Sequence, residues 1–202
     1  MEIFMRLYLY PGACSLADHI ALIEAGLPYD LMPIDHAKQT QDGRDYLTVN
    51  PRGYVPALEV EDGTILTENL VILAYIADRS GALLPAGEFG RWRALEALSY
   101  MATTIHGNLG PFFKKAPDTE KDAARKALAK GFAVLDEQMG VQPFLLGRTM
   151  SIADPYLFWT VLATSRFDIA VPERLQAFFD RMSQEPSVLR ALAEEGLSPS
   201  GR

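Results

Sequence analysis

The pattern of apolar residues changes once along this chain, and the change indicates the fold class. Up to residue 80, short β-rich runs alternate with helical patterns, whereas residues 91–195 follow helical periodicity throughout. The stretch between them, residues 81–90, holds three glycines and a proline, which interrupt regular structure. We therefore predict an α/β plus all-α architecture, with an α/β domain in residues 1–80, a linker in 81–90 and an all-helical domain in 91–202.

The first part of the chain predicts a strand, a helix and a second strand. Residues 6–10 form a β-rich run that stops at Pro11-Gly12, a pair that ends strand pairing. From Ser15 the apolar residues recur at helical spacing, and Gly26 is placed to end the helix. Residues 29–34 are typical of the next strand. These elements form a βαβ unit, so we expect two parallel strands.

Two further β-rich runs, residues 57–61 and 64–67, flank Asp62-Gly63. An Asp-Gly pair between such runs is the strongest short-range signal for a hairpin, so these strands should pair antiparallel. After Glu68 the apolar residues again follow helical spacing, as far as a stop near Gly81. The first 80 residues therefore predict the order βαβ followed by ββα.

The sequence of the second domain predicts helices only. The expected helices cover residues 91–113, 119–139, 151–167, 172–184 and 186–195. The third begins at a capping box, Ser151-Ile-Ala-Asp154, in which the Ser151 hydroxyl accepts from the Asp154 amide and the Asp154 carboxylate accepts from the Ser151 amide. We interpret this motif as structural.

Charge and composition exclude several kinds of protein. The chain has 19 basic and 26 acidic residues, and its net charge of −7 disfavours nucleic acid, which requires clustered Lys and Arg. Hydrophobic residues make up 49% of the chain, enough for a core without disulfides. Residues 1–6 lack the pattern of a signal peptide, and no apolar stretch approaches the roughly 18 residues of a membrane span. We expect a cytoplasmic protein with no membrane partner.

The histidines and the single cysteine limit the available chemistry. Cys14 is the only cysteine, so no internal disulfide can form. His19, His36 and His106 are scattered without metal-ligand spacing, and we predict no metal site. A serine hydrolase is poorly supported, because the chain contains no Gly-x-Ser-x-Gly elbow.

Cys14 lies where the first strand gives way to the first helix. Unpaired backbone amides and the positive end of the helix would face its sulfur there. Helix N-termini lower the pKa of thiols into the nucleophilic range, so we expect this position to favour a thiolate. The alternative is a small buried hydrophobic residue, as free cysteines often are.

Two motifs of the first domain could bind a ligand. Val55-Pro56 precedes a predicted strand, where a cis peptide bond would turn the Val55 backbone outward to pair with an extended peptide, although spacing alone favours a trans bond. Glu68 lies where a strand meets a helix, so its carboxylate could hold an ammonium group and nearby amides a carboxylate. Helix capping by Thr67 and Glu68 is the alternative that position alone favours.

His106 is the candidate of the helical domain. It lies in the first long predicted helix, with Thr103 three residues earlier on the same face. From this position the imidazole could donate a hydrogen bond to an anion.

Taken together, these motifs resemble those of beta-class bacterial glutathione transferases. The matching residues are Pro11-Gly-Ala-Cys-Ser-Leu16, Asn50-Pro-Arg-Gly-Tyr-Val-Pro-Ala-Leu58, Leu66-Thr-Glu68, His106 and Ser151-Ile-Ala-Asp154. The resemblance covers nearly the whole chain. It implies a thioredoxin-like N-terminal domain, an all-helical C-terminal domain that lines the co-substrate pocket, and a homodimer with glutathione bound between the two domains.

The resemblance also implies roles for single residues. Cys14 matches the family's active-site cysteine, and His106 would lie near the sulfur as a second catalytic residue. Val55, before a cis Pro56, would pair with the cysteinyl backbone of glutathione. Thr103 and His106 would approach glutathione from the helical domain.

The two ends of glutathione are assigned in the same way. Glu68 and Asn69 would hold the γ-glutamyl end. Lys38 would meet the glycyl carboxylate, with Gln39 as an equal candidate because the loop before Asp42 is one residue short of the family pattern.

Three functions remain open at this point. The first is conjugation, in which the thiol of glutathione, as co-substrate, attacks an electrophilic and largely apolar compound, as in detoxification. The second is thiol-disulfide exchange or reductive dehalogenation through Cys14, which suits a lone cysteine. The third is a non-catalytic ligand-binding or protein-interaction module, since fold does not determine function.

Overall fold

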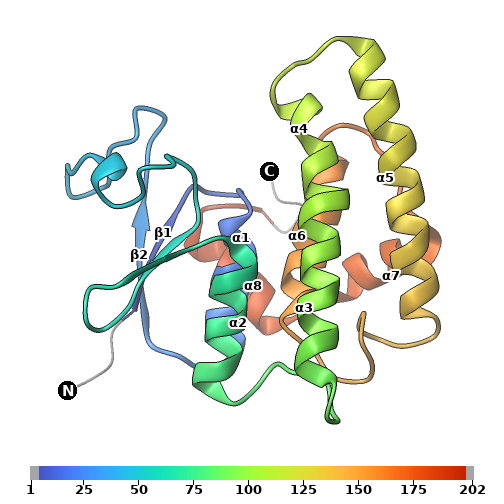
Figure 1. Ribbon diagram of the computed structural model, residues 1–202, viewed down its shortest axis with the longest axis horizontal. Helices are drawn as coiled ribbons and strands as arrows, with labels where there is room; N and C mark the ends of the chain where they lie inside the picture. Colours follow the sequence, from blue (N-terminus) through green and yellow to red (C-terminus); the bar gives the residue numbers. More distant parts are fainter. Residues whose placement is uncertain (1–4, 199–202) are drawn as a thin grey trace. The chain divides into compact units, whose positions relative to one another are not determined.

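The computed structural model describes residues 5–198, which form two compact units (Figure 1). One unit contains the described residues up to Ala82 together with those from Pro186 onward, and the other is Leu83–Glu185. The first unit carries the strands and the second is helical. The α/β plus all-α prediction is therefore confirmed.

The four strands of the first unit form one mixed sheet in the order β2-β1-β3-β4. Strands β1 and β2 are parallel, as the βαβ pattern predicts, and β3 and β4 form the expected antiparallel hairpin. Strand β3 also pairs antiparallel with β1. The strands are β1 (Met5–Leu9), β2 (Tyr29–Pro33), β3 (Ala57–Glu59) and β4 (Ile65–Thr67).

Helices α1 (Ser15–Glu24) and α2 (Asn69–Ser80) lie against one face of this sheet (Figure 1). Alternate side chains of a strand share a face, and Leu7 and Leu9 of β1 are at most 1% exposed. Helix α2 ends where predicted, because Gly81 has a φ of +67°, a left-handed conformation that glycine adopts without steric cost.

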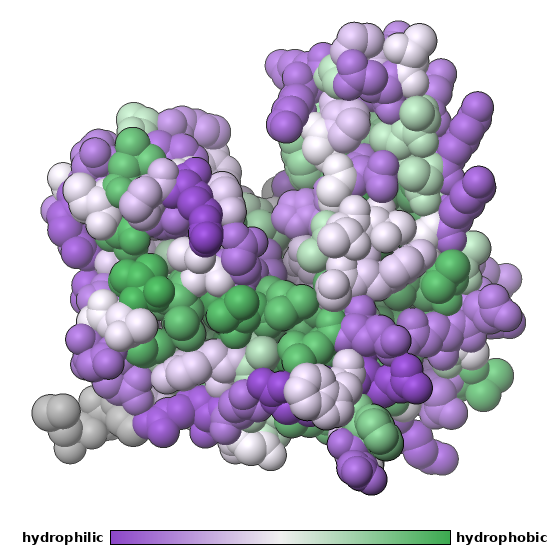
Figure 2. All heavy atoms as spheres, in the orientation of Figure 1, coloured by the Kyte–Doolittle hydropathy of each residue, from purple (hydrophilic) through white to green (hydrophobic). Residues whose placement is uncertain are grey.

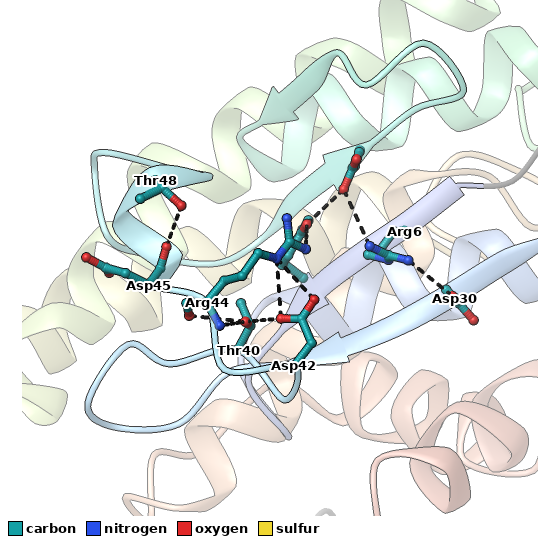
Figure 3. Close-up of polar contacts among 9 residues, drawn as sticks. Arg6, Asp30, Thr40, Asp42, Arg44, Asp45 and Thr48 are labelled. Atoms are coloured by element: carbon teal, nitrogen blue, oxygen red, sulfur yellow. Dashed lines mark hydrogen bonds and ion pairs between the residues drawn. The ribbon is translucent and has the colours of Figure 1, made fainter.

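The other face of the sheet carries a polar network (Figure 3). Arg6 pairs with Asp30 at 3.7 Å and with Glu59 at 4.0 Å, since the strand register places these residues side by side. The Tyr8 hydroxyl donates to Glu59 over 2.8 Å and accepts from Arg44 over 2.9 Å. Arg44 belongs to the long connection between β2 and β3, which is thereby held on the sheet.

The C-terminal helix differs from the expected domain boundary. We expected residues 91–202 to form one helical domain, yet α8 (Pro186–Glu194) packs on α1 in the first unit. Val188 and Leu192 of α8 are at most 1% exposed. Helical periodicity shows that a helix has a buried face, but not which neighbour covers it.

The second unit consists of helices, as predicted. They are α3 (Gly90–Tyr100), a π-helical turn (Met101–His106), α4 (Gly107–Phe113), α5 (Asp118–Met139), α6 (Ala153–Ser165) and α7 (Glu173–Met182). The predicted helix 91–113 is continuous in the chain but widens at the π turn. Within residues 5–198, no helix is long and apolar enough to cross a membrane.

Gly131 lets α5 approach the π turn closely. A Cβ atom at this position would lie 2.6 Å from Ile105 Cδ1 and 3.1 Å from Thr104 Cγ2. A larger residue here would therefore require the Ile105 and Thr104 side chains to shift.

The capping box before α6 is partly confirmed. The Ser151 amide donates to the Asp154 carboxylate over 2.7 Å, as expected, and the Ser151 hydroxyl donates to the same oxygen over 2.9 Å. The predicted hydrogen bond from the Asp154 amide to the Ser151 hydroxyl is not formed. That amide donates to the Ser151 carbonyl oxygen, and the hydroxyl accepts from Ala153, because α6 begins at Ala153, two residues after the serine.

Candidate functional site

Cys14 lies at the start of α1, immediately after the turn that follows β1. Its side chain is 9% exposed, and its thiol donates to the Val55 carbonyl oxygen over 3.4 Å. The Val55-Pro56 peptide bond is cis, as the family resemblance implies and against the expectation from spacing alone. Cys14 and the Val55-Pro56 motif therefore meet at the cysteine sulfur.

The surroundings of Cys14 disfavour the thiolate that we expected from its position in the sequence. Burial, and to a smaller extent the nearby Asp18 carboxylate, raise the pKa of the Cys14 thiol to about 12, against the smaller lowering by the Cys14 and Ser15 amides. The amides at the start of α1 lower the Cys14 pKa, as expected, but desolvation of the thiol raises it by more. At neutral pH the thiol keeps its proton.

Asp18 is a buried acid that the sequence analysis missed. Asn69 Nδ2 donates to Asp18 Oδ2 over 2.6 Å and to the Cys14 carbonyl oxygen over 2.9 Å. Among the described residues, Asp18 Oδ1 is buried without a hydrogen-bond partner, and burial raises the pKa of this carboxyl well above its usual value. Its position four residues after Cys14 on α1 was the available signal.

The Asn69 side chain bonds to two groups of α1. We expected it to hold the γ-glutamyl end of glutathione, but its amide nitrogen joins the first turn of α2 to α1. Only 8% of Asn69 is exposed. The assignment of Asn69 to the γ-glutamyl end of glutathione stays a prediction.

Glu68 is held in a strained backbone conformation, with a φ of +75°. Its carboxylate accepts from the Tyr54 hydroxyl over 2.7 Å and pairs with Arg52 at 3.5 Å. Arg52 also donates to the Thr67 hydroxyl over 2.6 Å. Among the described residues the Glu68 side chain caps no amide of α2, so the capping alternative is wrong for this carboxylate.

Lys38 and Gln39 lie in the connection between β2 and β3. The Lys38 amide donates to the Asp35 carbonyl, and the Gln39 amide donates to the Asp35 carboxylate over 2.8 Å. Lys38 has a φ of +62° and is half-buried, whereas Gln39 is exposed. The assignment of either residue to the glycyl carboxylate stays a prediction.

His106 belongs to the second unit and ends its π turn. Its Nδ1 lies 2.8 Å from the Tyr156 hydroxyl, and its ring meets the Trp159 ring edge-on at a centroid distance of 4.5 Å. Burial lowers the pKa of His106, so the imidazole is neutral at pH 7. The Thr103 side chain is exposed, and its hydroxyl donates to the Ser99 carbonyl over 3.0 Å.

Within the part of the chain that the structure describes, no three His, Cys, Asp or Glu side chains come together as metal ligands would.

Comparison with known proteins agrees with the family resemblance. Residues 13–79 match the model of the glutathione S-transferase N-terminal domain, and residues 98–186 match that of the C-terminal domain. The glutathione S-transferase GstA of Escherichia coli O157:H7 is 38% identical over 201 residues, which cover 96% of this chain and 100% of that protein.

Two solved structures extend this similarity to the fold. A sphingomonad glutathione S-transferase in complex with glutathione matches with a TM-score of 0.84 at 38% identity. The bacterial beta-class enzyme of Sphingomonas chungbukensis matches with a TM-score of 0.86, also at 38% identity. Each match covers 96% of this chain and 100% of the other.

The Asp18 carboxylate should control how readily Cys14 ionises. We expect Asp18→Asn to speed the alkylation of Cys14 by iodoacetamide in the alkaline range, by roughly three- to tenfold, because removing a buried carboxylate favours the thiolate. Cys14 is the only cysteine, so the mass of the alkylated protein reports on it alone. Asp122→Asn, on an exposed part of α5, is the control and should leave the rate unchanged. Equal rates in Asp18→Asn and the wild type would contradict this role.

Proposed function

This chain belongs to the glutathione S-transferase family and is a glutathione-conjugating enzyme, and we propose that the sulfur of glutathione attacks the electrophile while Cys14 stays a neutral hydrogen-bond donor. The observation that carries this proposal is the buried thiol, which donates to Val55 and has its pKa raised to about 12. Such a thiol lacks the negative charge that a nucleophilic cysteine needs.

In the proposed attack on the electrophile, the Cys14 thiol acts as a hydrogen-bond donor to the glutathione sulfur. When glutathione is bound, its S–H gives its proton to solvent, and the Cys14 S–H turns from the Val55 carbonyl to the resulting thiolate. A hydrogen bond to the charged form favours that form, so the thiolate is stabilised. Its lone pair forms the new sulfur–carbon bond while the leaving group departs with its bonding electrons. The protein contributes mainly by positioning.

The backbone beside Cys14 is suited to binding the peptide part of glutathione. We infer that Val55, turned by its cis bond to Pro56, pairs with the cysteinyl backbone of glutathione. Sphingomonad glutathione S-transferase, which shares this fold at 38% identity, was solved with glutathione bound. This pairing would place the glutathione sulfur beside the Cys14 thiol, which already contacts Val55.

Glu68 is the proposed partner for the γ-glutamyl ammonium group. Its carboxylate is 51% exposed and is oriented by Tyr54 and Arg52. An oriented carboxylate loses less freedom on binding an ammonium group than a mobile one does. The amides of the first turn of α2 would take the adjacent carboxylate.

His106 is proposed as a second contributor from the helical unit. Tyr156 and Trp159 hold its ring, and a neutral imidazole carries one N–H that can be donated to an anionic sulfur or to the leaving group. Thr103 stays a predicted contact of glutathione, supported only by its exposed position.

Thiol exchange through Cys14 is the competing function. It requires a Cys14 thiolate that attacks a disulfide sulfur, and the raised pKa of Cys14 opposes this. Relatives such as GstA of Escherichia coli O157:H7 are named as transferases, which favours an enzyme over a binding module.

We further propose a cytoplasmic homodimer. Apolar atoms reach the surface of the face seen in Figure 2, and large apolar residues that remain exposed include Leu47, Tyr54, Val71, Phe89 and Trp92. Covering such side chains is a common source of association energy. Light scattering should give about twice the mass of one 22.3-kDa chain, and a mass of one chain would contradict the dimer.

Two substitutions separate the roles of the Cys14 sulfur. Cys14→Ser keeps a hydrogen-bond donor and should retain conjugation of a generic aryl halide to within about tenfold of the wild type, whereas Cys14→Ala should lose more. Neither variant can form a mixed disulfide with glutathione. Steady-state rates with glutathione and the aryl halide give the comparison. A Cys14→Ser protein as inactive as Cys14→Ala would instead make the sulfur itself essential.

Glu68→Gln should weaken glutathione binding. We expect the KM for glutathione to rise about tenfold or more, with a smaller change in kcat, because the lost charge–charge contact is made before the chemical step. The control is Glu61→Gln, since Glu61 is likewise bonded to a tyrosine and an arginine, Tyr75 and Arg79. A KM that changes equally in both variants would remove Glu68 from the site.

A further inference from the structure

The Arg52 guanidinium lies beside Glu68 and has unused hydrogen-bond donors. Its Nη1 donates to the Thr67 hydroxyl over 2.6 Å and to Glu68 Oε1 over 3.5 Å. Among the described residues, its Nε and Nη2 have no hydrogen-bond or ion-pair partner, and the side chain is 57% exposed. A guanidinium presents its N–H donors in a fixed planar fork, so this one can bind a further group without leaving Thr67.

Hydrogen bonds to Asn50 fix the backbone from which Arg52 extends. The Arg52 amide donates to Asn50 Oδ1 over 3.1 Å, and the Gly53 amide donates to the Asn50 carbonyl oxygen over 2.8 Å. Only 1% of Asn50 is exposed. Val55, the proposed partner of the cysteinyl backbone of glutathione, lies three residues after Arg52. The same short segment therefore carries a peptide-pairing group and a cation.

The two oxygens of the Glu68 carboxylate have different surroundings. Oε1 accepts from the Tyr54 hydroxyl over 2.7 Å and from Arg52. Oε2 has no hydrogen-bond partner among the described residues, and the side chain is 51% exposed. Glu68 thus presents one oriented acceptor oxygen next to the unused donors of Arg52.

The γ-glutamyl end of glutathione is a zwitterion, with an ammonium group and a carboxylate on the same carbon atom. Glu68 can accept from the ammonium group, but it would repel the carboxylate beside it. Arg52 lies 3.5 Å from Glu68, so a zwitterion placed against this pair can have each of its charges next to the opposite one. A guanidinium and a carboxylate also form two parallel hydrogen bonds when their planes align.

We propose that Arg52 is a further glutathione-binding residue, which binds the carboxylate of the γ-glutamyl group while Glu68 binds its ammonium group. This inference rests on the proposed binding of glutathione at Glu68. The amides of the first turn of α2 share the carboxylate with Arg52. The pair selects the complete amino-acid end of glutathione, because removing either ligand charge leaves one member of the pair without its partner.

The test uses a glutathione analogue that lacks the carboxylate assigned to Arg52. In γ-aminobutyryl-cysteinylglycine a hydrogen atom replaces this carboxylate, and the ammonium group remains. We expect Arg52→Gln to raise the Kd of glutathione about fivefold or more, and to leave the Kd of the analogue within about twofold of the wild type. Titration calorimetry with the full chain measures both constants.

Two further variants complete the comparison. Arg79→Gln is the control, because Arg79 and Tyr75 bond to Glu61 much as Arg52 and Tyr54 bond to Glu68, and it should change neither constant. Arg52→Lys keeps the positive charge but loses the planar fork. Its Kd for glutathione should therefore lie between those of the wild type and Arg52→Gln.

An Arg52 that only orients Glu68 would act through the ammonium contact, which both ligands make. Equal losses of affinity for the two ligands would therefore overturn the proposal, as would an unchanged Kd for glutathione. If Arg52→Gln does not fold, modification of wild-type arginines by phenylglyoxal replaces it. Glutathione should then protect Arg52 and the analogue should not, and equal protection by the two would overturn the proposal.

Failure of the proposed function has a different outcome from failure of this assignment. A wild type that binds no glutathione would remove both. A wild type that binds and conjugates glutathione, with a Kd that Arg52→Gln leaves unchanged, would remove only the assignment of Arg52.

Discussion

Helix α1 is buried without a break from Ser15 to Leu22, and the structure of the first unit depends on how its polar groups are satisfied there. Buried polar groups need hydrogen-bond partners, and α1 takes them from two other helices. Asp18 is bonded by Asn69 at the start of α2, and His19 lies between the two glutamates at the end of α8. These contacts hold three helices together at the end of the sheet where Cys14 lies.

The same burial determines the chemistry that Cys14 can perform. A cysteine at an exposed helix N-terminus would ionise easily, but this one is enclosed near a buried carboxyl. The protein thereby has a thiol that donates a hydrogen bond to the carbonyl oxygen of Val55, the residue before the cis proline. A neutral donor assists an attacking sulfur that the substrate supplies. This division of roles is compatible with the proposed conjugation of glutathione.

The sequence predicted the fold well because its signals are local. Asp62-Gly63 and Gly81 mark the hairpin and the end of α2, and both predictions are confirmed. Contacts between distant residues were not accessible in this way. Periodicity predicted the last helix but assigned it to the wrong unit, since it says nothing about which neighbour covers the apolar face. The Cys14 pKa was misjudged for a related reason, because Cys14 contacts Val55 and Asn69, which are distant in the sequence and which no local pattern places beside it.

In the proposed reaction the thiolate belongs to glutathione and not to Cys14. Ultraviolet absorbance of thiolates, followed during a pH titration of the free and the glutathione-saturated enzyme, distinguishes the two. We expect no thiolate in the free enzyme at neutral pH, and one thiolate per site in the complex with a pKa below that of free glutathione. A thiolate already present at neutral pH in the free enzyme, and absent from Cys14→Ala, would show that Cys14 itself is the nucleophile.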